Sequence, residues 1–80
     1  MKNLNQVSLV GLRVVEAVGR LGSLKNAAEE LGITSGAVSQ QLHKTEHQLG
    51  RPLFSREPSG LKLTRLGAEI CRELTSGLKQ

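Results

Sequence analysis

Apolar residues recur about every three to four positions along most of the chain, which predicts a mainly helical protein. A first helix is expected over about residues 5–21, where Arg13, Glu16 and Arg20 form a narrow polar strip. Its broad apolar face consists of Val10, Leu12, Val14, Val15, Ala17, Val18 and Leu21. A helix with so little polar surface should pack in the core. Glu16 and Arg20 are one helical turn apart and should form an ion pair.

The second and third expected helices are separated by a very short turn. Ser23 is a favourable N-cap for the second helix, and Gly32 is a favourable terminator. Its apolar face consists of Leu24, Ala27, Ala28 and Leu31. The connection "LGIT", residues 31–34, is too short for the two helices to run side by side, so they should cross steeply. This geometry is that of a helix-turn-helix.

The third expected helix, residues 34–49, has one apolar and one polar face, and it carries no carboxylate before Glu46. Thr34 is expected to cap it and Gly50 to end it. The inner face consists of Val38, Leu42, Thr45 and Leu49, and the outer face of Gly36, Ser39, Gln40, His43 and His47. The outer face is therefore the first candidate for a functional surface. The pattern assigns no role to Glu46.

After Gly50 the apolar pattern changes from a helical to an alternating period. Leu61, Lys62 and Leu63 alternate, and Pro58 and Gly60 occupy the second and last positions of a type I turn. A short two-stranded hairpin, or wing, is expected over residues 51–63.

A last helix should follow, with Thr64 as its N-cap. An apolar residue recurs at every fourth position along it: Leu66, Ile70, Leu74 and Leu78. The first helix needs its apolar face for the second and third, so this row is expected to lack a partner within one monomer. Exposed rows of this kind usually mark an interface, which predicts a two-fold homodimer through these side chains.

Composition limits the possible functions. The chain has 80 residues, a formal net charge of +4 and a pI near 9.9, so it is expected to form one small domain without a deep substrate pocket. All its acidic residues are Glu, and Cys71 is its single cysteine, expected to be an inert packing residue. His43 and His47 have the spacing of a helical zinc pair but lack a third ligand nearby. We therefore expect neither an enzyme nor a metal site.

The positive charge is concentrated late in the chain, where residues 51–65 contain Arg51, Arg56, Lys62 and Arg65 against Glu57. Such a cluster is compatible with ordinary solvated surface, with nucleic acid or with an anionic membrane. No apolar run approaches the length needed to span a bilayer, and the N-terminus does not resemble a signal peptide. The expectation is a soluble, cytoplasmic chain without a membrane partner.

One long stretch carries a family resemblance: "GSLKNAAEELGITSGAVSQQLHKTEHQLGRPLFSREPSGLKLTRLGAE". It resembles the N-terminal DNA-binding domain of LysR-type transcriptional regulators, which combine S-[FL]-x-x-AA-x-x-L, [ST]-x-x-AVS-x-Q[IL], E-x-x-LG-x-x-LF-x-R and LT-x-x-G in this order. The resemblance implies a bacterial, nucleoid-associated regulator with a winged helix-turn-helix domain at residues 1–63. It implies a linker helix at residues 64–80 through which the domains dimerise. The effector-sensing domain of the family would follow, so no cofactor is expected in this domain.

The resemblance also assigns candidate contacts with double-stranded DNA. The base-edge candidates are Ser35, Gly36, Ser39 and Gln40, and the phosphate candidates are Thr34, His43, Lys44, Arg56 and Lys62. Short hydroxyls and a carboxamide near a helix N-terminus can enter a major groove, where Gln can pair with adenine. The missing acids fit this interpretation, because a carboxylate on the outer face would repel phosphates.

The chain departs from the family pattern at several positions of this surface. Gly36 stands where proline is usual, Gln40 where arginine is usual and Thr45 where leucine is common. The wing tip, residues 58–60, lacks the arginine that many members insert into the minor groove. The alternative function is a winged-helix module that binds another protein, for which an exposed apolar patch on the third helix or the wing would be the sign.

Overall fold

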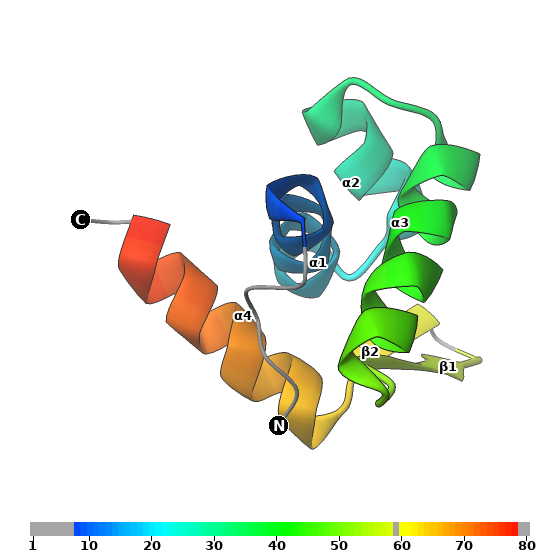
Figure 1. The fold of residues 1–80 in the computed structure, drawn as a ribbon. Coiled ribbons are helices and arrows are strands. Elements are labelled where there is room, and N and C mark those ends of the chain that lie inside the picture. The colour runs from blue at the N-terminus through cyan, green and yellow to red at the C-terminus, as the bar shows by residue number, and fades with distance from the viewer. Residues whose placement is uncertain (1–7, 59, 79–80) are drawn as a thin grey trace.

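The computed structural model describes residues 8–58 and 60–78, with side chains for all of these except 75, 77 and 78. Its elements are α1 (Leu9–Leu21), α2 (Leu24–Leu31), α3 (Ser35–Leu49), β1 (Phe54–Glu57), β2 (Gly60–Leu63) and α4 (Arg65–Leu78). Figure 1 shows α1 in the middle of the molecule, with α2 and α3 on one side, α4 on the other, and the hairpin near the C-terminal half of α3. The expected winged helix-turn-helix is confirmed.

The helix boundaries follow from caps that are visible in the sequence. Ser23 and Thr34 each accept a hydrogen bond from the backbone amide three residues later, at 3.1 Å. Glycines with left-handed backbone angles follow α1, α2 and α3, at positions where other residues would be strained. One boundary differs from expectation, because Ser8 is extended and caps α1, so that helix begins at Leu9. Residues 5–7 of the expected helix lie outside the described residues.

The core surrounds α1, whose Val14, Val15 and Val18 are almost completely buried. This helix contacts α2, α3 and α4. One member of its expected apolar face differs, since Val10 is 54% exposed. Val10 lies one turn before Val14 on the same side of α1. The described elements that cover Val14 therefore do not reach as far as the first turn of this helix.

The expectation that the apolar row of α4 lacks a partner within the monomer is wrong. Leu66 is 8% and Ile70 4% exposed, and both belong to the core. Leu74 is half-buried against that core, and the side chain of Leu78 lies outside the described residues. The predicted dimer rested on the exposure of this row. Because Leu66 and Ile70 are buried, that reason for a dimer no longer holds.

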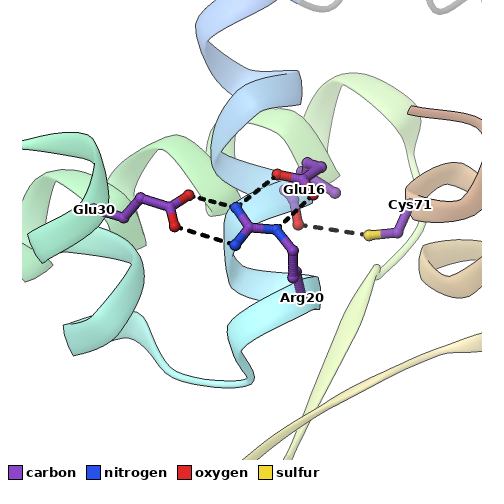
Figure 2. A network of polar contacts seen from close by, with 5 residues as sticks. Glu16, Arg20, Glu30 and Cys71 are labelled. Carbon is purple, nitrogen blue, oxygen red and sulfur yellow. Dashed lines mark hydrogen bonds and ion pairs between the residues drawn. The ribbon is translucent and has the colours of Figure 1, made fainter. Parts of the chain in front are cut away.

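A glycine on α1 allows α4 to pack closely against this helix. A Cβ atom on Gly19 would collide with Cys71 Sγ, so the two helices approach closely there. The Cys71 thiol donates a hydrogen bond of 3.5 Å to the backbone carbonyl of Val15 (Figure 2). Burial raises the pKa of this thiol, so it remains protonated and packs as an apolar group. The apolar face of α1 thus serves three neighbouring helices at once.

A polar network joins α1 to α2 on the surface (Figure 2). Arg20 Nε donates to Glu16 at 2.9 Å, which confirms the expected ion pair, and the same guanidinium also binds Glu30 of α2. These hydrogen bonds raise the pKa of Arg20 and lower the pKa of Glu30. Arg20 and Glu30 are 44% and 45% exposed in their side chains, so solvent screens the pair.

The wing is a two-stranded antiparallel sheet in which Phe54 pairs with Leu63 and Glu57 with Gly60. Pro58 follows β1 as expected for the turn, but Ser59 lies outside the described residues, so the turn type remains a prediction. Thr64 Oγ1 accepts the Gly67 amide at 3.1 Å, which confirms its role as the cap of α4. The division into residues 1–63 and 64–80 remains a prediction, although α4 shares one core with the other helices.

Candidate nucleic-acid interface

The packing of α3 separates its two faces as expected. Val38, Leu42, Thr45 and Leu49 are buried in the core. Their spacing of three to four residues holds one side of the helix inward and turns the opposite side to solvent. The exposed candidates are Thr34, Ser35, Gly36, Gln40, His43 and Lys44, while Ser39 is half-buried. The structure therefore presents the polar face, free of acids, as a continuous surface along α3.

The start of α3 is suited to an anionic partner. Thr34 Oγ1 accepts the Ala37 amide at 3.1 Å, and the first turn contains no acidic residue. The backbone amides of a first helical turn, together with the helix dipole, favour negative charge. A Cβ atom at Gly36 would meet only Thr34 Oγ1, at 3.9 Å, so the surface here is open. A phosphate or a base edge can therefore approach the backbone closely.

A small hollow of about 70 Å³ lies where α3 meets the wing. It brings together three candidates that are far apart in the sequence: Ser39 and His43 from α3, and Arg56 from β1. Arg56 also borders a second hollow of about 460 Å³. Ser23 and Leu24, at the start of α2, line this hollow as well. Lys44 and Lys62 are exposed but line neither hollow.

The two basic residues of the wing face opposite ways. Arg56 pairs with Leu61 across the hairpin, and Lys62 pairs with Ser55. Cross-strand partners point to the same side of a sheet, and neighbours along a strand point to opposite sides. Arg56 therefore shares the face of Leu61, which packs toward the core, whereas Lys62 lies on the outer face. The sequence pattern alone did not distinguish the directions in which these two residues point.

The basic side chains near this surface form no ion pair with an acid within the described part of the chain. Within residues 8–58 and 60–78, the ion pairs use Arg20, at the α1–α2 contact, and Arg65, on α4. The basic residues of α3 and the wing are all exposed: Lys44, Arg51, Arg56 and Lys62. An anion approaching α3 would therefore meet exposed basic side chains, with Glu46 and Glu57 as the acids that lie close to Arg56 around the two hollows.

Sequence reasoning missed one residue of this region. Glu46 Oε2 accepts hydrogen bonds from the amides of Leu53 and Phe54, at 2.7 Å and 3.1 Å, and so ties α3 to the wing. The sequence contained one sign of this role, since Glu46 is the only acid on a helix whose outer face has none. Within the described ranges, no group of three His, Cys, Asp or Glu side chains that could hold a metal ion is found.

Comparison with known families and structures shows which proteins this chain resembles. The model of the bacterial regulatory helix-turn-helix proteins of the lysR family matches residues 9–68, which include α1, α2, α3 and the wing. The chain belongs to this family. The match ends near the start of α4, just after the Thr64 cap.

Several regulators of the LysR family are similar in sequence. TrpI, a transcriptional regulator of Pseudomonas aeruginosa, is 48% identical over 63 residues, which cover 79% of this chain and 21% of that protein. The transcriptional activator AmpR of Providencia stuartii is 41% identical over 76 residues, which cover 95% of this chain and 26% of that protein. The chain thus spans about a fifth to a quarter of the length of these relatives.

Solved LysR-family structures share the fold. The DNA-binding domain of CbnR, in a complex with DNA, superposes with a TM-score of 0.81 at 25% identity and covers 90% of this chain and 83% of that one. An OxyR mutant of Corynebacterium glutamicum gives a TM-score of 0.84 at 26% identity, covering 91% of this chain and 24% of that one. Among the described residues, no helix has the length and apolar character needed to cross a membrane.

Proposed function

We propose that this LysR-family chain binds double-stranded DNA, as the DNA-binding domain of a bacterial transcriptional regulator. The observation that carries the proposal is the outer face of α3, which is exposed, polar and free of acids up to Glu46. A helix of this kind fits the major groove, and the adjacent wing is placed to reach the backbone or the minor groove. The similarity to the CbnR domain, whose structure contains DNA, supports DNA binding by this fold.

The candidate residues have distinct roles in this proposal. Ser35, Gly36, Ser39 and Gln40 meet base edges, and Thr34, His43, Lys44, Arg56 and Lys62 meet phosphates. The phosphate contacts supply affinity and register, while the base contacts discriminate between sequences. Gln40 is the candidate for adenine, because its carboxamide offers both a donor and an acceptor.

The proposal includes a homodimer in the cytoplasm, associated with the nucleoid. Two α3 helices would then contact half-sites about 34 Å, or a multiple of that distance, apart on one side of the duplex. Because Leu66 and Ile70 are buried in the monomer, a dimer through α4 would use the parts of this helix that remain accessible. A small-molecule effector would bind a domain outside this chain, and the DNA-binding domain itself would use no cofactor.

The alternative, a protein-interaction module, finds no support on the surface concerned. The large apolar residues exposed within residues 8–58 and 60–78 are Leu9, Val10 and Ile33. They lie on α1 and in the turn before α3, and therefore outside the outer face of α3 and the wing. A patch that binds another protein through α3 would require apolar side chains there.

The direct test is a fluorescence anisotropy titration of mixed-sequence duplex DNA at low salt, repeated at rising salt. Binding should weaken steeply, with the logarithm of the affinity falling by about 0.9 per contacted phosphate for each unit of log salt. A duplex with the natural operator should bind more tightly than mixed DNA at every salt concentration. Absence of binding at low salt would contradict the proposed function.

A further inference from the structure

One carboxylate on α3 holds the first residues of the wing. Glu46 Oε2 accepts the amides of Leu53 at 2.7 Å and Phe54 at 3.1 Å, in a partly buried position. The backbone carbonyl of Glu46 also accepts the amides of Gly50 at 2.8 Å and Arg51 at 3.3 Å. Glu46 therefore binds both ends of the connection that leads from α3 to β1.

The other side of this connection is held by the start of α4. Thr64 donates its amide to the Leu53 carbonyl at 3.0 Å and its hydroxyl to the Pro52 carbonyl at 2.9 Å. A Cβ atom at Gly67 would collide with the Leu53 carbonyl, so α4 lies directly against the connection. The Leu53 side chain is fully buried. The connection is thus fixed to α4 by Thr64 and to α3 by Glu46.

The direction of the wing depends on this joint. Phe54 is the first residue of β1, and Arg56 lies two residues later on the same side of the strand. Arg56 borders the hollow of about 70 Å³ that Ser39 and His43 of α3 also line. A rotation of β1 at Phe54 would therefore change the spacing between Arg56 and the outer face of α3.

We propose that Glu46 is a positioning residue for DNA binding, which sets the spacing between α3 and Arg56 so that both reach one duplex. This inference rests on the proposed function. Two contact elements on one rigid body share a single loss of translational and rotational freedom, whereas a loose joint adds a cost of ordering. A carboxylate suits the task, because an ionised acceptor forms stronger hydrogen bonds with backbone amides than a neutral one.

The test is a double-mutant cycle on DNA affinity between Glu46→Gln and Arg56→Ala. Glutamine keeps the size of the side chain and removes the charge that strengthens both hydrogen bonds. Arg56→Ala should weaken DNA binding in the unmodified chain and have little effect in the Glu46→Gln background. We expect a coupling of about fivefold or more in the dissociation constant, within the range for residues joined by one network. The loss of about one unit of salt slope on Arg56→Ala should also disappear in that background.

Two controls separate positioning from charge and from stability. Glu73→Gln removes the same charge from an exposed site on α4, and Arg56→Ala should keep its full effect in that background. Affinities are compared at a temperature where circular dichroism shows every variant to be folded. Hydrogen exchange should accelerate at the Leu53 and Phe54 amides in Glu46→Gln while the core amides of α1 remain protected.

The outcomes distinguish this inference from the proposed function. If the unmodified chain does not bind DNA, the proposed function fails and the inference with it. If the chain binds DNA, two results overturn the positioning role alone. Either Arg56→Ala weakens binding equally in the unmodified chain and in the Glu46→Gln background, or it weakens binding in neither. Should Glu46→Gln not fold, Glu46→Asp replaces it, since it keeps the charge and shortens the reach. Failure of both variants to fold would show that the carboxylate serves the fold itself, which also overturns the positioning role.

Discussion

Ser39 and Gln40 are neighbours in the sequence but differ in their surroundings. Ser39 is half-buried beside the hollow at the wing, whereas Gln40 is fully on the outer face of α3. Gln40→Glu should abolish DNA binding without unfolding the domain, because an exposed site tolerates the change to within about 0.5 kcal/mol while phosphates and base acceptors repel the carboxylate. Ser39→Glu should abolish binding as well, with a larger effect on stability.

Anisotropy titrations and thermal unfolding of each variant provide the measurement. Gln48→Glu is the control, since it makes the same chemical change at a half-buried site in the last turns of α3, away from the base-edge candidates. It should weaken binding much less than Gln40→Glu. Unchanged affinity for Gln40→Glu would mean that α3 does not enter the groove.

Glu30 makes stability depend on pH in a defined direction. Hydrogen bonds from Arg20 lower the pKa of Glu30 below its ordinary value of 4.5. A carboxyl group with a lowered pKa in the folded state stabilises the fold above its unfolded pKa and loses that contribution as the pH falls through the folded value. The stability difference between the unmodified chain and Glu30→Gln should thus be largest near neutral pH and shrink below the ordinary value of 4.5.

Chemical denaturation of the two proteins at neutral pH and at about pH 3 checks this sign. Glu29→Gln changes the exposed neighbour on the same helix and is the control for general charge effects. High salt should reduce the Glu30 difference, because both partners are close to half exposed. A Glu30 difference that is constant across this pH range would contradict the assigned pairing.

Individual residues also show where sequence reasoning reaches its limit. Glu16 and Arg20 are paired by helical spacing alone, so the sequence could predict their contact. Glu30 joins them from another helix, and no local spacing encodes that approach. Glu46 was missed for a similar reason, because its partners are backbone amides, which every residue except proline carries.

At the scale of elements, α3 was predictable and the packing of α4 was not. The inner and outer faces of α3 follow from its period, since both are properties of one helix. The period of α4 showed that Leu66 and Ile70 share a face, but it could not show which surface covers that face. The close approach of Gly19 and Cys71 shows that α4 packs directly on α1, and this approach depends on how two distant segments meet.

The proposed function gives the wing two phosphate contacts, made by side chains on opposite faces of the hairpin. Arg56 and Lys62 were expected to act alike, so that replacing both by Ala would flatten the dependence of log affinity on log salt by about two units, one per phosphate contact. The structure adds that each should be tested alone, because only Arg56 borders the hollow beside α3. Both single variants should lose affinity for all sequences alike.

Salt titrations of Arg56→Ala, Lys62→Ala and the double variant measure these contributions separately. Arg72→Ala, at an exposed site on α4, removes the same charge and should leave the slope nearly unchanged. If neither wing variant changes the slope, the wing does not contact the DNA backbone. If Arg56→Ala alone changes the salt slope, only the face of the hairpin that carries Arg56 lies against the duplex.

At the scale of the whole molecule, α4 has two possible roles, in the core of one monomer and in the contact between two. Ile70 is 4% exposed and lies in the core, whereas Leu74 is half-buried. Ile70→Glu should therefore unfold the domain rather than separate a dimer, because an unpaired buried charge costs about 3–5 kcal/mol. That cost approaches the lower end of the range of stabilities of folded domains, about 5–15 kcal/mol.

Leu74→Glu is the substitution that tests the dimer, because a half-buried site can accept a charge at lower cost. If the accessible side of α4 forms the contact, this variant should remain helical by circular dichroism and sediment as a monomer at concentrations where the unmodified chain is a dimer. It should also weaken binding to a duplex with two half-sites far more than to a single half-site, because the second contact is no longer made by the same body. Sedimentation of the unmodified chain as a monomer at tens of micromolar, with the amides of α4 protected from hydrogen exchange, would instead show that α4 serves the core of one monomer alone.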